Sequence, residues 1–292
     1  MTGGSVDGFR ANRNLAIAAE SMGIAVGMGS IRVLFENEEL FEHFHLKRFA
    51  PSVPVLANIG GAQMRDIPGD VLFEIVRRLE ADALVIHLNP GQELFQPDGD
   101  RNFRGIRDAI GRAVDLSPVP IIIKETGFGI SPRLIAELAS IGVAHVDVSG
   151  AGGTNWISVE SYRGDEAHFQ AAGEFDHWGL PTAFILSAVR RLHGIRYDRF
   201  LLASGGLRSG QDVAKSIALG AEMAGAALPF IRAESTDGVE GVVSVAEQMV
   251  ATLRRVMVLT ACGSIAELRS APTWSNASFA SEVASLCEAS NE

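Results

Sequence analysis

Short apolar segments that each stop at a polar, glycine-rich turn recur along this chain and most constrain its fold. The segments are residues 24–28, 54–57, 84–88, 120–124, 145–148, 200–203 and 221–227. Stretches with apolar residues at helical spacing separate them. Strands that alternate with helices indicate parallel βαβ units. With a stub before Thr2 counted as a strand, the pattern predicts an α/β fold, a (β/α)8 TIM barrel whose first strand is truncated.

The intervening helices follow from apolar periodicity and from capping residues. The predicted ranges are 12–22, 38–49, 70–80, 103–114, 132–140, 181–192, 211–219 and 241–258. Ser131 is expected to cap its helix, with Pro132 at the first helical position. We assign residues 1–270 to the barrel domain and 271–292 to a mobile C-terminal tail. An open doubly wound sheet is the alternative, but no Gly-x-Gly-x-x-Gly motif opens a first helix.

Charge and cysteine content exclude several classes of partner. The net charge is −10 over 292 residues, and such a chain lacks the positive field that nucleic acids and anionic membranes require. An anionic ligand would therefore need local cations, helix N-termini or a metal. Cys262 and Cys287 are too few for a disulfide framework. Without a signal peptide or an apolar run of membrane-spanning length, we expect a soluble, cytoplasmic protein.

The apolar run that ends at His87 leads into a cluster of polar side chains. His87 and Asn89 are two residues apart, so both point to the same side of an extended strand. Gln92 and Glu93 follow in a loop tightened by Pro and Gly. An imidazole, amides and a carboxylate at the carboxyl end of a strand predict the reaction centre. A solvated polar turn is the alternative interpretation.

Two later glycine-rich stretches, 204–210 and 224–228, follow the predicted seventh and eighth strands, where barrels commonly bind phosphate. Backbone amides and Arg208 would hold the anion, although simple strand-to-helix closure also explains the glycines. Lys124 ends an isoleucine-rich strand and needs an anionic partner. That partner could be Glu125, or Lys124 could face the electron-rich edge of a flavin ring.

Further polar residues at the ends of strands suit a flavin and a phosphorylated substrate. Arg32 could bind a substrate phosphate, and Glu93 is a hard oxygen ligand suited to Mg²⁺, although a solvated glutamate is the commoner situation. Neutral hydrogen bonds to the flavin ring and ribityl chain could come from Thr2, Ser30, Asn58 and Thr154.

Seven motifs, taken together and in order, resemble those of type 2 isopentenyl-diphosphate Δ-isomerase. They are Met1-Thr2-Gly3-Gly4, Gly29-Ser30-Ile31-Arg32, Ala57-Asn58-Ile59-Gly60, His87-Leu88-Asn89-Pro90-x-Gln92-Glu93, Ile123-Lys124-Glu125-Thr126-Gly127-Phe128-Gly129, Ser149-Gly150-Ala151-Gly152-Gly153-Thr154 and Ser204-Gly205-Gly206-Leu207-Arg208. They cover nearly the whole chain. Seven motifs in register are far more specific than any one of them.

The resemblance implies a barrel that interconverts isopentenyl and dimethylallyl diphosphate with reduced FMN and Mg²⁺, with NADPH as reductant. It implies catalytic roles for Gln92 and His87 and a metal ligand in Glu93. The substrate positions that it implies are Ser30, Ile31, Arg32, His87, Asn89 and Gln92. The implied FMN positions are Met1, Thr2, Gly3, Ser30, Asn58, Lys124, Ser149, Thr154, Gly206, Leu207, Arg208, Ala227 and Leu228. A homo-oligomer is expected, because barrels of this type often assemble.

An amide is a poor acid, so we expect the reduced flavin to carry most of the proton transfer while Gln92 orients or relays. The family usually has residues before Met-Thr-Gly-Gly, including a basic Arg-Lys pair that grips the diphosphate, and we expect that Met1 is an internal methionine. Ile31 stands where the family often has a polar residue. The alternatives are an FMN-dependent oxidoreductase of the 2-hydroxy-acid type and a non-catalytic flavin-binding barrel.

Overall fold

The computed structural model describes residues 2–193 and 200–290. They fall into two compact units, and each is described by itself. Unit 1 consists of Met1–Leu88, Phe103–Ile123 and Ala227–Gln248, and unit 2 consists of Asn89–Asn102, Lys124–Ala226 and Met249–Glu292.

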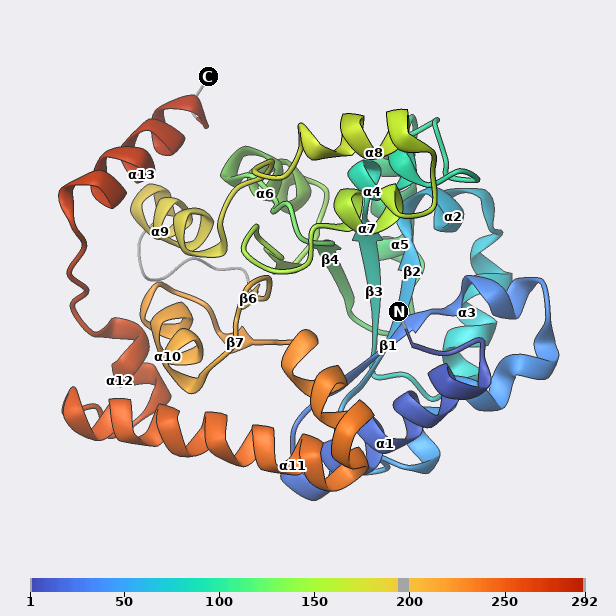
Figure 1. Ribbon diagram of the computed structural model, residues 1–292, viewed down its shortest axis with the longest axis horizontal. Coiled ribbons are helices and arrows are strands. Elements are labelled where there is room, and N and C mark those ends of the chain that lie inside the picture. The colour runs from blue at the N-terminus through green and yellow to red at the C-terminus, as the bar shows by residue number, and fades with distance from the viewer. Residues whose placement is uncertain (1, 194–199, 291–292) are drawn as a thin grey trace. The chain divides into compact units, whose positions relative to one another are not determined.

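Parallel strands form the centre of unit 1. They are β1 (Val26–Ser30), β2 (Val55–Gly60), β3 (Ala83–Leu88) and the first residues of β4 (Ile121–Glu125), and Figure 1 shows the first three side by side. In the register, Ser30 lies beside Asn58, and Gly60 lies beside His87. The polar side chains therefore stand at the carboxyl ends of adjacent strands.

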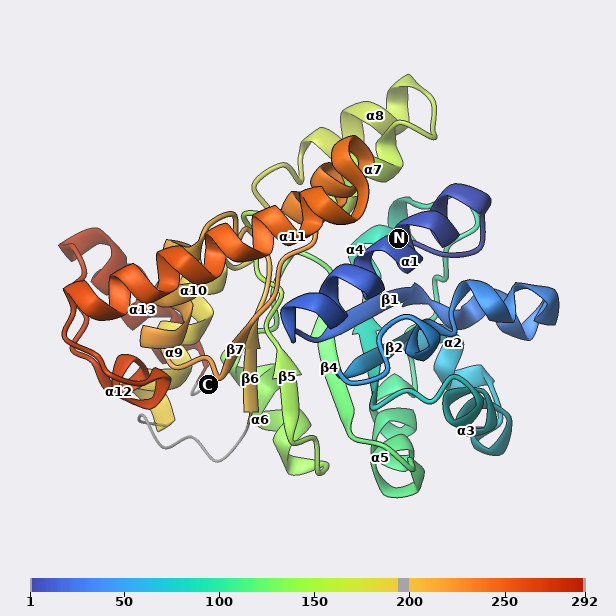
Figure 2. The same cartoon turned by 90° about the horizontal axis from the view of Figure 1, so that it is seen from below.

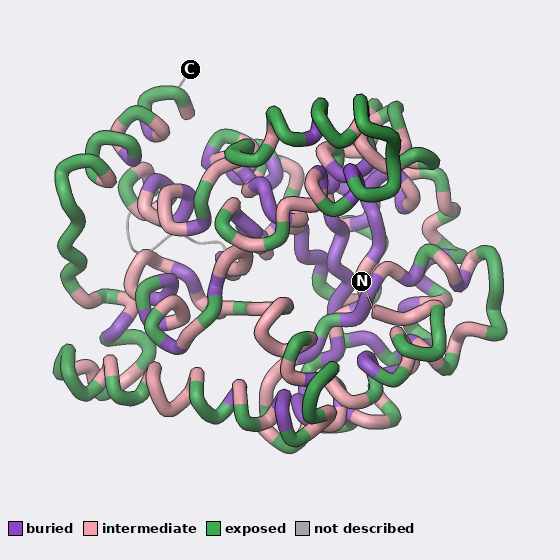
Figure 3. The backbone as a smooth tube through the Cα atoms, viewed as in Figure 1, coloured by how far each residue is buried: buried purple, intermediate pink, exposed green. Residues whose placement is uncertain are grey.

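Helices surround the strands of unit 1. They are α1 (Val6–Met22), η1 (Ile31–Phe35), η2 (Glu38–His43), η3 (Leu46–Arg48), α2 (Gly61–Asp66), α3 (Gly69–Arg78), α5 (Ile106–Leu116) and the first part of α11 (Leu228–Leu259). Figure 3 shows β2 and β3 mainly buried. The helix predicted over 38–49 is present as 3-10 turns, because Asn37 caps a short turn and the chain re-enters another at His45.

Unit 2 repeats the parallel arrangement. The end of β4 is followed by β5 (His145–Asp147), β6 (Phe200–Ala203) and β7 (Met223–Ala224). Asp147 of β5 lies beside Leu202 of β6, and Ala203 lies beside Ala224 of β7; these strands are side by side in Figure 2. Polar turns again follow at the carboxyl ends.

The helices of unit 2 are α4 (Pro90–Phe95), α6 (Pro132–Ser140), α7 (Trp156–Ser161), α8 (Glu166–Gly173), α9 (Thr182–His193), α10 (Gly210–Ala218), the rest of α11, α12 (Ile265–Ser270) and α13 (Ala277–Ala289). The predicted cap of α6 is confirmed, since Ser131 Oγ accepts from the Leu134 amide at 3.2 Å. The loop predicted after Asn89 is wrong in part. Pro90 begins α4 instead, because its fixed φ suits the first helical position.

Two further elements differ from the prediction. Helix α11 begins at Leu228 rather than Gly241, and Gly238 interrupts it with φ 57° and ψ −136°, a conformation that favours glycine. The segment 271–292 contains α13, whose Val283 and Cys287 are buried against Ala188 of α9. The rings of Phe184 and Phe279 stack with centroids 4.6 Å apart. The segment 271–292 therefore contains a packed helix. Its mobility stays a prediction.

Parallel strands alternating with helices make this an α/β protein of the (β/α)8 barrel class, as predicted. The predicted stub before Thr2 lies outside the described residues, which contain seven strands. Assignment of 1–270 to one domain stays a prediction. None of the helices in the described part of the chain is long and apolar enough to cross a lipid bilayer.

Candidate functional site

In unit 1, His87 is held at the end of β3 by the neighbouring strand. Its Nδ1 lies 3.0 Å from Oδ1 of Asn58, and only 4% of the residue is exposed. Because an amide oxygen can only accept, Nδ1 carries the proton and donates it. A Cβ on Gly60 would lie 3.2 Å from Nε2 of His87, so this glycine lets the ring pack close to β2. Asn58 and His87 therefore form a fixed pair.

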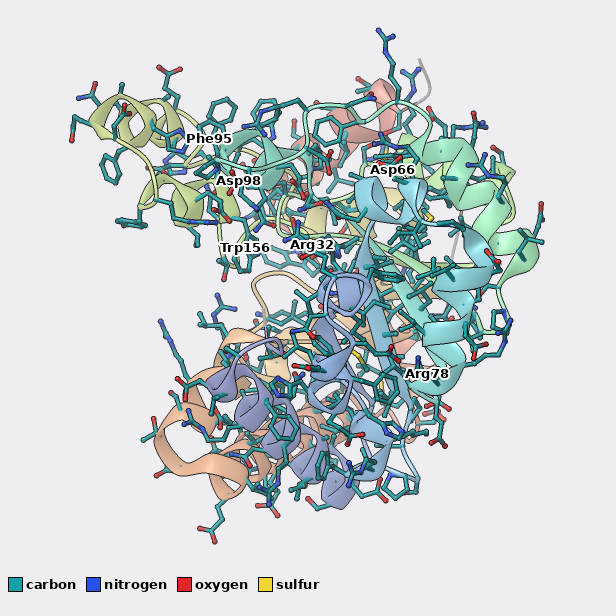
Figure 4. All side chains as sticks on the ribbon, turned by 90° about the vertical axis from the view of Figure 1, so that its right-hand side faces the viewer. Arg32, Asp66, Arg78, Phe95, Asp98 and Trp156 are labelled. Carbon is teal, nitrogen blue, oxygen red and sulfur yellow. The ribbon has the colours of Figure 1, made fainter. Side chains whose placement is uncertain are left out.

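The end of β1 presents a second set of predicted residues. A Cβ on Gly29 would lie 2.0 Å from the carbonyl oxygen of Thr2, so the glycine allows the N-terminal segment to pack on the strand. Ser30 ends β1 and caps η1, and its Oγ accepts from the Arg32 amide at 3.4 Å. Arg32 is exposed at the position labelled in Figure 4. Ile31 is fully buried, so a substrate contact at this residue would have to come from its backbone.

In unit 2, four buried side chains form one hydrogen-bonded network. The Asn89 amide donates to Gln92 Oε1 at 3.2 Å and to Glu93 Oε1 at 3.0 Å. Gln92 Nε2 donates to Glu160 Oε1 at 3.0 Å, and Arg163 donates to the other Glu160 oxygen at 2.9 Å. Each of the four is 4–6% exposed. Burying a carboxylate costs free energy unless hydrogen-bond donors surround it. Here neutral amides supply most of those donors.

The network is held by α4 and α7, which pack on one another. Figure 4 labels Phe95 and Trp156 on these two helices. Asn155 caps α7 by accepting from the amides of Ile157 and Ser158. The sequence analysis missed Glu160, because six residues of α7 are too few for apolar spacing to reveal a helix.

Glu93, the predicted Mg²⁺ ligand, has both carboxylate oxygens engaged. Oε1 accepts from Asn89, and Oε2 accepts from the Asp100 amide at 2.8 Å. A carboxylate oxygen that accepts a hydrogen bond can in general also bind a cation. Within residues 2–193 and 200–290, no group of three or more His, Cys, Asp and Glu side chains could hold a metal ion. Glu93 therefore fits Mg²⁺ only if other ligands, such as substrate phosphate oxygens, complete the shell.

Lys124 is the penultimate residue of β4 and is half-buried. Its Nζ donates to the carbonyl oxygen of Glu125, whereas the Glu125 carboxylate accepts from the amides of Gly127 and Phe128 at 2.6 and 2.5 Å. The two side chains thus do not form the hydrogen-bonded pair considered from sequence. Burial lowers the pKa of Lys124, and the charges of Asp147 and Glu125 oppose that shift.

Asp147 ends β5 and was missed in the sequence analysis. Ser204 Oγ lies 2.8 Å from each of its carboxylate oxygens, and the Ser149 amide donates at 3.1 Å. Burial raises the pKa of Asp147, against which Lys124 and these donors act. Ser149 has φ 39°, which is uncommon outside glycine. The signal was available, because His145 and Asp147 alternate as His87 and Asn89 do.

The predicted phosphate loop 204–210 meets the turn 149–154 backbone to backbone. A Cβ on Gly205, which has φ +89°, would lie 2.0 Å from the carbonyl oxygen of Gly150, and one on Gly206 would lie 2.9 Å from the carbonyl carbon of Gly152. Thr182 Oγ1 holds the loop 204–210 by donating to the carbonyl oxygens of Ser204 and Gly205, each at 2.8 Å. Only glycine fits where these loops approach.

The donor set beside these loops suits an anionic cofactor. Arg208 is exposed and donates to the Leu207 carbonyl at 3.1 Å, while Leu207 itself is buried. Thr154 is exposed, and a Cβ on Gly127 would lie 2.6 Å from its carbonyl oxygen. Two cations, Lys124 and Arg208, and closely packed glycine loops fit the phosphate and the electron-rich ring of FMN.

The remaining predicted FMN residues lie in unit 1. Thr2, Gly3, Ser30 and Asn58 belong to the N-terminal segment and to the ends of β1 and β2, and Leu228 begins α11 directly after Ala227. Met1 lies outside the described residues. The predicted meeting of His87 and Asn89 on one face stays a prediction, as do the individual roles of all these residues.

Comparison with known proteins decides the family. An isopentenyl-diphosphate delta-isomerase of Borrelia garinii subsp. bavariensis is 41% identical over 269 residues, which are 92% of this chain and 74% of that protein. The enzymes of that name from a Nostoc species and from Pyrococcus abyssi are 41% and 39% identical, over 92% and 93% of this chain and 76% and 75% of their own lengths. The chain belongs to the isopentenyl-diphosphate delta-isomerase family. The resemblance found in its motifs is thereby confirmed.

A second comparison bears on the cofactor class of this isomerase family. Residues 106–275 match the family of FMN-dependent dehydrogenases, which supports FMN. Among solved structures, a lactate oxidase of Pediococcus acidilactici aligns with a TM-score of 0.63 and 17% identity over 89% of this chain and 70% of its own. A mandelate oxidase variant aligns with a TM-score of 0.61 and 19% identity over 91% of this chain and 74% of its own. At that identity, the two oxidases show a common fold.

Proposed function

We propose that this protein interconverts isopentenyl diphosphate and dimethylallyl diphosphate. The observation that carries the proposal is the buried network in which Asn89 and Gln92 link the carboxylates of Glu93 and Glu160. Relatives about 40% identical along nearly the whole chain carry the name of that isomerase. The network offers fixed polar groups for a reaction that moves a double bond without net oxidation.

Binding of FMN is assigned to the glycine loops and the cations beside them. In unit 2, Lys124 faces the flavin ring, and Ser149, Thr154 and the residues 206–208 hold the remainder. In unit 1, the contributing residues are Met1, Thr2, Gly3, Ser30, Asn58, Ala227 and Leu228. NADPH is the proposed reductant. The chemistry that reduced FMN supplies when bound is proton transfer to and from the alkene.

The chain's own residues bind and orient the substrate in this proposal. Ser30, Arg32 and the backbone of Ile31 contact the diphosphate, and His87 and Asn89 contact substrate from the ends of their strands. Gln92 lies beside the alkene, where its amide orients the reacting end. The amide cannot titrate near neutral pH, so it keeps one geometry while protons move. Glu160 fixes that amide by accepting from Nε2.

In this proposal Glu93 would hold Mg²⁺, which would neutralise charge on the substrate diphosphate. Since Glu93 is a single carboxylate with both oxygens already accepting hydrogen bonds, the ion should bind tightly only with the diphosphate present. Calorimetry with Mg²⁺ alone and with Mg²⁺ plus isopentenyl diphosphate measures this difference. A Glu93→Gln variant should require more Mg²⁺ for half-maximal activity, whereas equal Mg²⁺ requirements would remove Glu93 from the metal site.

The deciding experiment is anaerobic conversion of isopentenyl diphosphate with FMN, NADPH and Mg²⁺, followed by detection of dimethylallyl diphosphate. Omitting NADPH should abolish turnover, and FMN should bind in a one-to-one complex. Flavin binding without isomerisation, by this chain and by a version extended upstream of Met1, would overturn the proposal. Oxygen consumption with lactate or mandelate tests the oxidoreductase alternative, which the match to FMN-dependent dehydrogenases keeps open. The expected homo-oligomer is testable by light scattering.

A further inference from the structure

Thr182 of unit 2 carries a buried hydroxyl to which the proposed function gives no role. The residue begins α9 and is 6% exposed. Pro181, which precedes it, pairs with Ala151 in a parallel β-bridge, and the Ala151 amide donates to the carbonyl oxygen of Leu180 at 2.9 Å. The start of α9 is therefore fixed against the turn 149–154. Burying a hydroxyl costs free energy unless it is hydrogen-bonded, so its partners show what it holds.

The Thr182 hydroxyl lies between two successive backbone carbonyl groups. Its Oγ1 is 2.8 Å from the carbonyl oxygen of Ser204 and 2.8 Å from that of Gly205. A hydroxyl has a single proton to donate, so the two carbonyl oxygens share it and both are directed at the start of α9. Gly205 has a φ of +89°, a conformation that favours glycine. The hydroxyl thus holds the loop 204–210 at the residue where its backbone turns.

The turn after β5 packs on the same point. A Cβ on Gly150 would lie 2.6 Å from Oγ1 of Thr182, so glycine leaves the room that the hydroxyl occupies. The Gly150 amide donates to the carbonyl oxygen of Ser204 at 3.1 Å, and Oγ of Ser204 lies 2.8 Å from each carboxylate oxygen of Asp147. Three segments thus meet at Ser204. Of these hydrogen bonds, only the one from Thr182 also reaches Gly205.

We propose that Thr182 is a positioning residue whose hydroxyl sets the course of residues 204–208 and thereby prepares them for the phosphate of FMN. This inference rests on the proposed binding of FMN by the glycine loops. Thr182 acts through the backbone of Ser204 and Gly205 and does not itself contact the cofactor. Adjacent glycines have large conformational freedom. A loop already held in one course loses less of that freedom when the anion binds, which favours affinity.

Three substitutions separate the hydroxyl from the rest of the side chain. Thr182→Val keeps the branched shape and replaces the hydroxyl by a methyl group, whereas Thr182→Ser keeps the hydroxyl and removes the methyl group. Thr260→Val is the matched control, because Oγ1 of the exposed Thr260 also donates to a backbone carbonyl oxygen, that of Val256, at 2.8 Å. Thermal unfolding checks that each variant folds.

The first measurement needs no flavin. Hydrogen exchange of the Gly150 amide, followed by NMR, reports on the loop because its acceptor is the carbonyl oxygen of Ser204. In Thr182→Val this exchange should be about tenfold faster, as expected when a hydrogen bond that holds the acceptor is lost. Thr182→Ser and Thr260→Val should exchange as the wild type does. Wild-type exchange in Thr182→Val would show that the hydroxyl does not hold the loop and would overturn the inference.

The second measurement compares the affinities of FMN and riboflavin by flavin fluorescence, using the full chain freed of cofactor. The two flavins differ only in the phosphate, so the ratio of their affinities isolates the part of the site that the loop would form. Thr182→Val should weaken FMN binding about tenfold and riboflavin binding by less than about twofold. Thr182→Ser should restore the wild-type ratio, and Thr260→Val should retain it.

The outcomes separate this inference from the proposed function. If Thr182→Val weakens both flavins equally, the hydroxyl has only a general structural role and the inference is wrong. If the wild type prefers FMN and Thr182→Val keeps that preference, the proposed function stands and this inference alone fails. A wild type that binds FMN no more tightly than riboflavin would refute the assignment of the phosphate to the glycine loops and this inference with it.

Discussion

Replacement of Gln92 by leucine tests the buried network most directly. Leucine has a similar volume and no polar atoms, so the change removes the amide without leaving a large cavity. Glu160 then loses the donor at 3.0 Å, and Asn89 loses the acceptor at 3.2 Å. Glu160 keeps Arg163, and Asn89 keeps Glu93. Neither group is left entirely alone, which limits the cost.

The two lost hydrogen bonds set the expected magnitude. A hydrogen bond to a charged group contributes about 1.5–3 kcal/mol and a neutral one about 0.5–1.5 kcal/mol, so Gln92→Leu should lose about 2–4 kcal/mol of unfolding free energy. For a chain of this size, that corresponds to a fall in Tm of roughly 4–15 °C. Loss of the group that orients the alkene should lower kcat/KM about 100-fold, or about 2.7 kcal/mol.

Calorimetric unfolding and the anaerobic isomerase assay measure the two effects separately. Gln211→Leu is the control, because Gln211 is exposed near the start of α10, and neither Tm nor turnover should change appreciably. FMN affinity should be unchanged in both variants, since Gln92 is assigned to substrate. Wild-type turnover in Gln92→Leu would refute the assigned role, and an unchanged Tm would refute the energetic reasoning about the network.

Three more perturbations have expected outcomes. Gly205→Ala places a Cβ 2.0 Å from the Gly150 carbonyl oxygen and should lower both Tm and FMN affinity, whereas Gly111→Ala, in α5 with nothing near its Cβ, should raise stability by about 0.5–1 kcal/mol. Burial lowers the pKa of His145. The stability that its neutral form contributes is therefore present above about pH 6.5 and is lost as pH falls below that value. His145→Gln should narrow the difference in Tm between pH 8 and pH 5. Ending the chain at Ser275 removes α13 with its buried Val283 and Cys287, and the free energy of unfolding should fall by about 3 kcal/mol. Removing residues 291–292 alone should leave the Tm unchanged. Equal Tm values for the two truncated chains would favour the mobile tail.

The sequence predicted the strands well because each is a continuous apolar run that ends at a polar turn. Residues 200–203 coincide with β6, and Ser131 caps α6 as expected. The short helices α7 and α8 were missed because six and eight residues give too few apolar repeats to define a period. The packing of α13 on α9 could not be predicted either, since it depends on a partner face about a hundred residues earlier in the chain.

The site residues that follow strands could be predicted from the sequence. Their hydrogen-bond partners on helices could not. His87, Asn89 and Lys124 were found from their position alone. Glu160 reaches Gln92 across 68 positions of sequence, and no local pattern connects them. Asp147 could have been found, because the alternation that marked His87 and Asn89 also marks His145 and Asp147.

The two polar clusters of unit 2 differ in how they hold charge, and the difference suits different tasks. Around Gln92, neutral amides stand between buried carboxylates, so the geometry does not depend on the protonation of the amides. Around Lys124, burial lowers the pKa of the ammonium while the charges of Asp147 and Glu125 oppose that shift, so the surroundings act on its protonation state. A non-titrating group suits the orientation of an apolar alkene, and a controlled cation suits an anionic ring. A carboxylate at position 92 would titrate beside Glu160, so Gln92→Glu should give turnover a pH dependence that the amide does not impose.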